Sequence, residues 1–288
     1  MGSTQNISAL ASGQKLTFDN SWIFEEHFWE EFRIETNMID ELSEYNNIYQ
    51  QSPHFIEYPM HFNVNNTTGI ENGSYEHPFT KFKYSGPNYY HFGFDFIINN
   101  NRPGCVAKVY VYPGLYGDVT GNAFSIYNME LKGEGNVSDI LVSKDAFSVS
   151  GYTLIENMTF QDVNPNLAIA PIVIDGKTST VRGCVFKDNP VAISCQNTWS
   201  WNGYKTSANL TNNIFYDNGS ALRVADDEIT VDLINNVMIN NNRFLDISLG
   251  DDPTNQILIK NNIIRDNINN TLSPVNAQIT NNYNNTDI

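Results

Sequence analysis

One short pattern recurs through the second half of the chain and constrains the fold more than any other feature. Each copy begins at a glycine or asparagine and ends on a large apolar residue. The five copies are Asn157–Phe160, Gly183–Phe186, Asn212–Phe215, Asn235–Met238 and Asn261–Ile264. Their last members are 26, 29, 23 and 26 residues apart. A period of this length is typical of repeat proteins in which each unit stacks on its neighbours.

Each copy is followed by a polar pair and then by a short strand pattern. The polar pairs are Asp188-Asn189, Asp217-Asn218, Asn240-Asn241 and Asp266-Asn267. Apolar residues then alternate as in a strand with one buried face, at Ile193 and Cys195, Leu222 and Val224, and Leu245 and Ile247. Short strands and polar turns in every period predict a β-solenoid. Its interior should hold Cys195 and one stacked column formed by Phe160, Phe186, Phe215, Met238 and Ile264.

Asparagine is the residue that the repeats use most. The chain has 42 asparagines, and 22 of them fall in the last 92 residues. In stacked coils about 4.8 Å apart, equivalent asparagines can bond to one another and to turn amides that would otherwise be buried without partners. We therefore assign Asn157, Asn212, Asn235 and Asn261 to the fold rather than to chemistry.

Several stretches resemble the first coils of the pectin-lyase-like superfamily. They are Gly73–Phe79, Tyr110–Tyr116, Leu131–Asn136 and Thr153–Gln161. The resemblance implies an all-β fold, a right-handed parallel β-helix of about seven coils with an N-terminal helical or extended cap. It does not fix an activity, because this superfamily includes lyases, hydrolases, esterases, viral tailspikes and structural proteins.

Residues 1–75 differ from the rest and form the expected N-terminal arm and cap, with residues 76–288 as the β-helix domain. Met38, Leu42, Tyr45 and Tyr49 recur at the spacing of an amphipathic helix. The arm either packs on the end of the larger body or attaches the protein to another chain.

Charge and composition exclude several classes of function. Lys and Arg number 16 and Asp and Glu 32, giving a formal charge of −16. This balance disfavours nucleic acid and anionic membrane surfaces, which require clustered basic residues. No apolar run is long enough for a spanning helix, so no membrane insertion is expected. The cysteines, Cys105, Cys184 and Cys195, are too few for a closed disulfide framework and show no zinc-binding spacing.

Comparison with the enzymes of the superfamily gives only fragments of their catalytic motifs. Gly114–Tyr116, Thr159–Gln161 and Ala221–Val224 resemble pectinesterase strands, but the catalytic-aspartate motifs of that family have no counterpart. Gly250–Asp252 resembles the paired aspartates of polygalacturonases, whose histidine motif is missing. Inverting hydrolysis would pair Asp251 with Asp226 or Asp227 at about 6.5–9.5 Å, and Asp252 is a further candidate catalytic residue. A lyase would need a basic residue, for which Arg182, Arg223, Arg243, Arg265 and Lys260 are candidates outside any family motif.

The strongest candidate site comes from three turns at equivalent places in successive repeats. The turn after Cys195 carries Trp199, Trp201 and Tyr204. The equivalent turns after Val224 and Ile247 carry Asp226 and Asp227, and Asp251 and Asp252. Aromatic rings beside carboxylates suit sugars, because rings stack on C–H faces and carboxylates accept hydroxyl bonds. The four aspartates could instead hold calcium, although no cofactor is required. The alternative is a solvated acidic turn beside a loop that packs on its own aromatics.

These features favour a surface-exposed or secreted β-helix protein that engages a polysaccharide, without proven catalysis. One alternative is a structural or assembly protein, such as a virion, tail or fibre component, whose residues 1–75 contact a partner or a second copy. The other is a polysaccharide lyase or glycoside hydrolase. An extracellular, cell-surface or virion location is expected in each case.

Overall fold

The computed structural model divides the chain into two units, Met1–Ile56 and Glu57–Ile288. It describes residues 32–35, 48–51, 59–71, 73–82, 94, 97, 106–117, 123–166, 170–198, 205–247, 254–268, 278–282 and 285–286. The boundary between the units lies earlier than the 75/76 boundary expected from the sequence. The physical reason is that strand β3 (Met60–Phe62) already pairs with β4 (Ala107–Val111) of the larger unit.

The smaller unit contains one antiparallel strand pair, β1 (Phe32–Glu35) and β2 (Ile48–Gln51). Tyr49 pairs with Ile34 in this ladder. The amphipathic helix predicted through Tyr49 is therefore wrong at that residue, which lies in a strand. Adjacent Ile48 and Tyr49 are both good strand formers, and pairing with β1 satisfies their backbone groups. Met38, Leu42 and Tyr45 lie outside the described residues.

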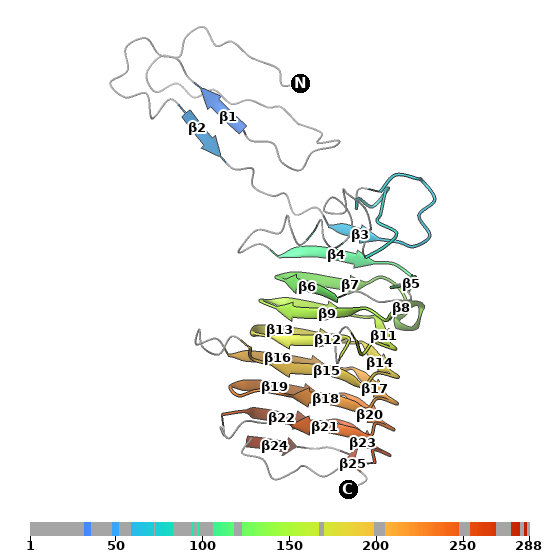
Figure 1. Ribbon diagram of the computed structural model, residues 1–288, viewed down its shortest axis with the longest axis vertical. Helices are drawn as coiled ribbons and strands as arrows, with labels where there is room; N and C mark the ends of the chain where they lie inside the picture. Colours follow the sequence, from blue (N-terminus) through green and yellow to red (C-terminus); the bar gives the residue numbers. More distant parts are fainter. Residues whose placement is uncertain are drawn as a thin grey trace, which may run out of the picture. The chain divides into compact units, whose positions relative to one another are not determined.

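The larger unit is a stack of parallel strands in three sheets (Figure 1). The nine-stranded sheet contains β3, β4, β7 (Met129–Gly133), β10 (Thr153–Glu156), β13 (Lys177–Arg182), β16 (Thr206–Thr211), β19 (Ile229–Ile234), β22 (Gln256–Lys260) and β24 (Gln278–Asn282). The eight-stranded sheet contains β5 (Gly114–Tyr116), β8 (Ile140–Ser143), β11 (Thr159–Gln161), β14 (Val185–Lys187), β17 (Ile214–Tyr216), β20 (Val237–Ile239), β23 (Ile263–Arg265) and β25 (Asn285–Thr286). The six-stranded sheet contains β6 (Ala123–Tyr127), β9 (Ala146–Ser150), β12 (Ile172–Asp175), β15 (Val191–Gln196), β18 (Ser220–Val224) and β21 (Arg243–Ile247).

From β4 to β21, each coil contributes one strand to each sheet, in the order nine-, eight- and six-stranded. The result is a parallel β-solenoid of about six coils, which confirms the predicted fold class and is close to the seven coils expected. A 3-10 turn, η3 (Val137–Asp139), lies between β7 and β8. Among the described residues no helix is long and apolar enough to cross a membrane.

The predicted interior column is confirmed. Strand pairing places Phe160, Phe186, Phe215, Met238 and Ile264 at successive register positions of the eight-stranded sheet. All five are at most 2% exposed. The rings of Phe160, Phe186 and Phe215 stack with centroids 5.2 Å apart. Cys195 is also interior, between Ile174 and Val224.

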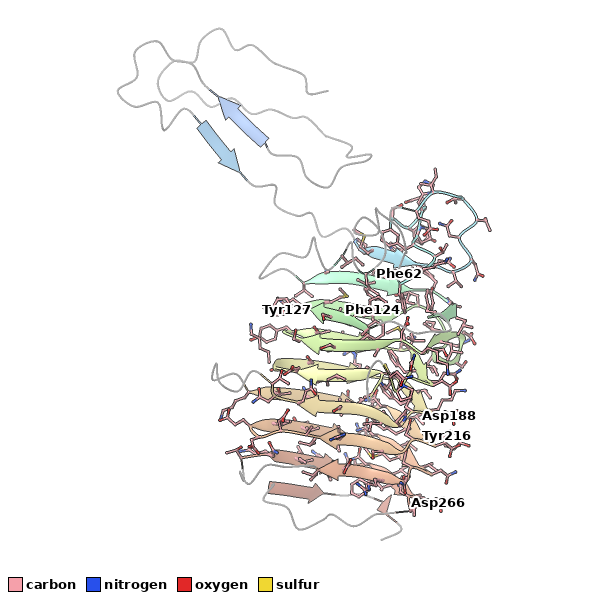
Figure 2. The ribbon with its side chains drawn as sticks, in the orientation of Figure 1. Phe62, Phe124, Tyr127, Asp188, Tyr216 and Asp266 are labelled. Atoms are coloured by element: carbon pink, nitrogen blue, oxygen red, sulfur yellow. The ribbon has the colours of Figure 1, made fainter. Side chains whose placement is uncertain are left out.

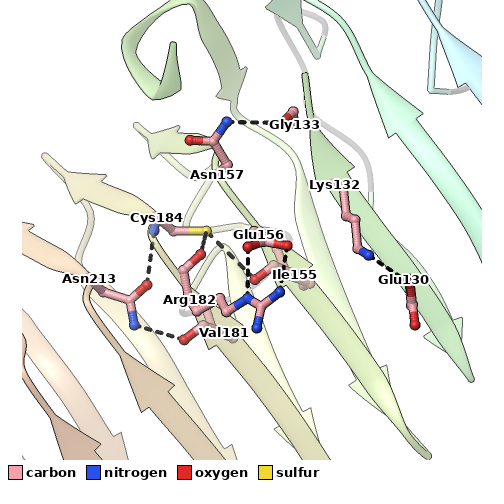
Figure 3. Close-up of polar contacts among 10 residues, drawn as sticks. All are labelled: Glu130, Lys132, Gly133, Ile155, Glu156, Asn157, Val181, Arg182, Cys184 and Asn213. Carbon is pink, nitrogen blue, oxygen red and sulfur yellow. Dashed lines mark hydrogen bonds and ion pairs between the residues drawn. The ribbon is translucent and has the colours of Figure 1, made fainter. Parts of the chain in front are cut away.

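The asparagines have the structural role predicted, but the buried column lies one residue later than expected. Asn157, Asn212, Asn235 and Asn261 take left-handed backbone conformations, with φ between 55° and 59°. Asparagine tolerates this region better than most residues. The next residues form the ladder, in which Asn213, Asn236 and Asn262 are at most 1% exposed. In Figure 3, Asn213 donates to the Val181 carbonyl at 2.9 Å and accepts from the Cys184 amide at 3.0 Å.

A second ladder follows the eight-stranded sheet and repeats the same design. Its buried members are Asn189, Asn218, Asn241 and Asn267. The left-handed residues before them are Asp188, Asp217, Asn240 and Asp266. Figure 2 shows Asp188 and Asp266 at the outer margin of the stack, whereas Phe62 and Phe124 lie inside. Each turn therefore pairs one exposed left-handed residue with one buried carboxamide.

Truncating the interior column tests its contribution to stability. Phe215→Ala should lower the free energy of unfolding by about 3–5 kcal/mol, because it removes a buried ring from between Phe186 and Met238. The matched control is Tyr216→Ala, whose ring is 43% exposed on the same strand. Denaturant titration of both variants measures the difference. A loss below about 1 kcal/mol for Phe215→Ala would place the ring outside the core.

A second substitution tests the asparagine ladder. Asn218 donates to the carbonyls of Phe186 and Tyr216 and accepts from the Asn189 amide. Asn218→Ala should cost about 3 kcal/mol or more, since these main-chain groups each lose a partner.

The control is Asn212→Gly, because Gly183 occupies the equivalent left-handed position of the preceding coil with φ 62°. This variant should stay within about 0.5 kcal/mol of the parent. Equal losses in Asn218→Ala and Asn212→Gly would contradict the assignment of the ladder to the buried asparagines.

Candidate functional site

The three predicted turns start from one edge of the solenoid. Strand pairing places Cys195 beside Val224 and Val224 beside Ile247, so β15, β18 and β21 end at the same level of the six-stranded sheet. The connections that follow are residues 197–205, 225–228 and 248–255. The sequence prediction that these turns leave one edge on successive coils is therefore supported by the register.

The connection 197–205 is fastened where it begins. The Thr198 amide donates to Asp175 at 3.0 Å, and its hydroxyl donates to the other carboxylate oxygen of Asp175. Asp175 is only 8% exposed and belongs to the preceding coil. On the other side, the Asn197 amide donates to the Asp226 carboxylate at 2.9 Å. The first residues of the connection are thus bonded to both neighbouring coils.

The same connection is fastened where it ends. Thr206, the first residue of β16, is fully buried. Its hydroxyl donates to the Gln196 carbonyl at 2.8 Å and accepts from the Gly176 amide at 2.8 Å. The two ends of the connection are therefore closed against one another by buried polar contacts. Trp199, Trp201 and Tyr204 belong to the sequence between these anchors and lie outside the described residues.

The acidic turn has a structural role that the sequence did not indicate. One carboxylate oxygen of Asp226 holds the Asn197 amide, and the Asp226 carbonyl accepts from the Asn255 side chain at 2.8 Å. The Asp227 carbonyl accepts from the Asn197 side chain at 3.3 Å. Both aspartates are partly buried. Asp251 and Asp252, the other members of the predicted acidic edge, lie outside the described residues.

Sequence reasoning missed the residues that position this edge, which are Asp175, Asn197, Thr198, Thr206 and Asn255. A signal for some of them was present. Asp175 and Gln196 follow the interior residues Ile174 and Cys195 at the same offset, so they are neighbours in the stack. Nothing in the repeat pattern, however, pairs Asp175 with Thr198 of the next coil.

The described part of the chain offers few groups for nucleophilic or metal chemistry. Burial raises the pKa of the Cys184 and Cys195 thiols to about 12, so neither is a reactive thiolate near neutral pH. Within the described residues no three or more His, Cys, Asp or Glu side chains gather as a metal site. Calcium at the acidic edge would therefore need Asp251 and Asp252 in addition to Asp226 and Asp227.

Basic side chains on the outer face of the nine-stranded sheet are engaged in surface ion pairs. Arg182 binds Glu156 of the adjacent strand through two contacts of 2.7 and 3.0 Å, and Lys132 binds Glu130 at 2.9 Å (Figure 3). The hydrogen bonds that Arg182 donates to the Glu156 carboxylate raise the pKa of Arg182. A guanidinium held in its charged form by a carboxylate is a poor candidate for the base of a lyase.

No model of a known protein family matches the chain, and the searches of curated proteins and of solved structures find no match either. The function is therefore inferred from the geometry of the site.

Removing the first anchor should loosen the connection without unfolding the solenoid. In Asp175→Ala, the amides of residues 198–205 should exchange with solvent at least about tenfold faster, since hydrogen bonds to a charged group contribute about 1.5–3 kcal/mol. Asp232→Ala, at an outward position of β19, is the control. Hydrogen exchange followed by mass spectrometry gives the comparison. Unchanged exchange in Asp175→Ala would show that this carboxylate does not hold the connection.

Proposed function

We propose that the protein binds a neutral polysaccharide at the edge formed by the connections after β15, β18 and β21. Trp199, Trp201 and Tyr204 supply the stacking surfaces, and Asp226, Asp227, Asp251 and Asp252 accept sugar hydroxyls. The observation that carries the proposal is the double anchoring of connection 197–205, through Thr198 at its start and Thr206 at its end. The proposed location is outside the cell, on its surface or on a virion.

Anchoring favours binding because each flexible group that a ligand must order costs conformational entropy and weakens the affinity. A segment whose two ends are already fixed loses less conformational entropy when a ligand arrives. Tryptophan and tyrosine then give large contact areas with few rotatable bonds. A long, aromatic-rich connection that is fastened at both ends is expected of a binding element more than of a passive linker.

The negative charge of the protein favours neutral glycans over acidic ones. At −16, the molecule repels polyuronates, and like charges lower both the encounter rate and the affinity. A uronate ligand would need calcium between itself and the four aspartates. A neutral glycan needs no metal, so its binding should be insensitive to chelators and only weakly dependent on salt.

The enzymatic alternative is that the aspartates of the same edge also hydrolyse the bound polysaccharide. A glycoside hydrolase would use Asp251 or Asp252 with Asp226 or Asp227 as acid and base. Release of new reducing ends from a polysaccharide, abolished by Asp251→Asn, would establish this activity.

An assembly role is the second candidate, and a specific observation favours it. One outward column of the eight-stranded sheet is apolar over most of its length, with Val185, Ile214, Val237 and Ile263 in successive register positions. Ile214 and Ile263 are 43% and 40% exposed. A second copy presents the same column with the same repeat of about 4.8 Å, so the two columns can interdigitate. Residues 1–75 remain the other proposed partner-binding segment.

One experiment separates these functions. Calorimetric titration of neutral and uronic oligosaccharides, with and without chelator, should show binding of a neutral glycan that Trp201→Ala weakens at least about tenfold, as expected for a central aromatic anchor. Tyr216→Ala, on the eight-stranded sheet, is the control. Unchanged binding in Trp201→Ala would refute the site, and calcium-dependent uronate binding would refute the neutral ligand. Absence of any binding, with a mass that rises with concentration, would support assembly.

A further inference from the structure

A cluster of aromatic side chains lies on the outer face of the nine-stranded sheet, at the first coil of the solenoid. Its members are His61, Tyr75, Tyr110 and Tyr112, which we call the tyrosine platform. His61 of β3 pairs with Tyr110 of β4. Their neighbours Phe62, Val109 and Val111 are fully buried in the core, so His61 and Tyr110 occupy the alternate, outward positions.

The rings of the platform are in mutual contact. The His61 ring stacks on those of Tyr110 and Tyr112, with centroids 5.4 and 5.9 Å apart. Tyr75 meets His61 and Tyr112 edge to face at 5.5 and 6.4 Å. Tyr75 is 68% exposed, whereas His61 beneath it is only 7% exposed. The platform therefore presents one exposed ring that is supported from below by the others.

Backbone bonds hold Tyr75 in this position. The His61 amide donates to the Gly73 carbonyl at 2.8 Å, and the Gly73 amide donates to the His77 carbonyl at 3.0 Å. Gly73 has φ 80°, and a Cβ atom there would lie 2.6 Å from the Phe79 ring. Only glycine fits at this position, and its backbone bonds tie the turn that carries Tyr75 to β3.

Polar groups lie near His61 in the platform. The Tyr112 hydroxyl lies 3.3 Å from Nδ1 of His61. Burial lowers the pKa of His61, while the negative charges of Glu76 and Glu134 oppose this effect. Both glutamates are exposed, and both are close enough to act on the imidazole. The platform thus combines a fixed aromatic face, a hydroxyl and two carboxylate acceptors.

This geometry discriminates between the ligands that aromatic clusters bind. A cage for an ammonium group needs ring faces that point at a shared empty volume, with the cation within about 6 Å of each centroid. Here the rings contact one another at centroid distances of 5.4–6.4 Å, and of the four residues only Tyr75 is exposed. One exposed ring with two exposed carboxylates nearby suits instead the flat C–H face of a pyranose, whose hydroxyls can donate to the carboxylates.

We infer that the tyrosine platform is a second saccharide-binding site, separate from connection 197–205 and specific for a neutral pyranose. Tyr75 stacks on the sugar ring, His61, Tyr110 and Tyr112 fix the orientation of Tyr75, and Glu76 and Glu134 accept sugar hydroxyls. The site does not depend on the function proposed for the connection, because no residue is shared between them.

The test uses the full-length protein carrying Trp201→Ala, so that stacking at the connection does not contribute. The probes are neutral oligosaccharides of glucose, galactose, mannose, xylose and N-acetylglucosamine, with tetramethylammonium as the cationic probe. At least one oligosaccharide should bind this protein. Adding Tyr75→Ala should weaken that binding at least about tenfold. Adding Tyr75→Phe, which keeps the ring, should preserve it.

The matched control is Tyr152→Ala, because Tyr152 is 65% exposed and Tyr75 68%. It should leave binding unchanged, and thermal unfolding should show that each variant is folded. Three results would overturn the inference: no oligosaccharide binds, Tyr75→Ala binds as its parent does, or only tetramethylammonium binds. Comparison of the wild type with Trp201→Ala tests the connection separately, so failure of one site is distinguishable from failure of the other.

Discussion

The hydrogen bonds of the buried asparagines are the interaction on which the solenoid depends. Each carboxamide bonds to main-chain groups of the preceding coil, as Asn236 does by donating to the Leu210 carbonyl and accepting from the Asn213 amide. A turn between two strands would otherwise bury amides and carbonyls without partners, at a cost of about 1–3 kcal/mol each. Because the same contacts recur on successive coils from β14 to β23, they also fix the register of these strands. The stacked column at Phe186 and Phe215 is a consequence of that register.

The asparagine ladders fix the number of residues in two of the three turns of a coil, whereas the length of the third turn varies. Between β13 and β23 the turn from the nine- to the eight-stranded sheet always has two residues, as at 183–184 and 212–213, and the following turn has three, as at 188–190 and 217–219. The turn after the six-stranded sheet ranges from the single residue 176 to the connection 197–205. This turn tolerates insertions because neither asparagine ladder runs through it. Binding residues are often carried by loops that a rigid scaffold positions. The candidate edge is therefore formed by the turns whose length the ladders do not fix.

This division also explains what the sequence could and could not predict. The interior column follows from repeated apolar residues at fixed offsets, so Phe160 to Ile264 were placed correctly. The buried asparagines were predicted one residue early, because Asn212-Asn213 and Asn235-Asn236 are doublets whose members differ only in backbone conformation. The contact of Asp175 with Thr198 is unique to one coil and leaves no periodic trace. The tyrosine platform was missed because β3 lies before the repeats, and because residues far apart in the sequence, such as His61 and Tyr112, meet only through the pairing of β3 with β4.

Both proposed sites adjoin strands of the nine-stranded sheet. The separation of these strands along the stack determines how long a ligand must be to contact both sites. Connection 197–205 leads into β16, which is separated from β4 by β7, β10 and β13. Four strand spacings of about 4.8 Å amount to about 19 Å along the stack. If both proposals hold, a short oligosaccharide would occupy one site at a time, whereas a polymer longer than this separation would contact both. The second contact is then intramolecular, and avidity exceeds either single affinity by up to about 10²–10⁴ when the spacing of the ligand matches. A rigid solenoid suits this arrangement because stacking holds the separation constant, so weak individual sites are sufficient to retain a polysaccharide.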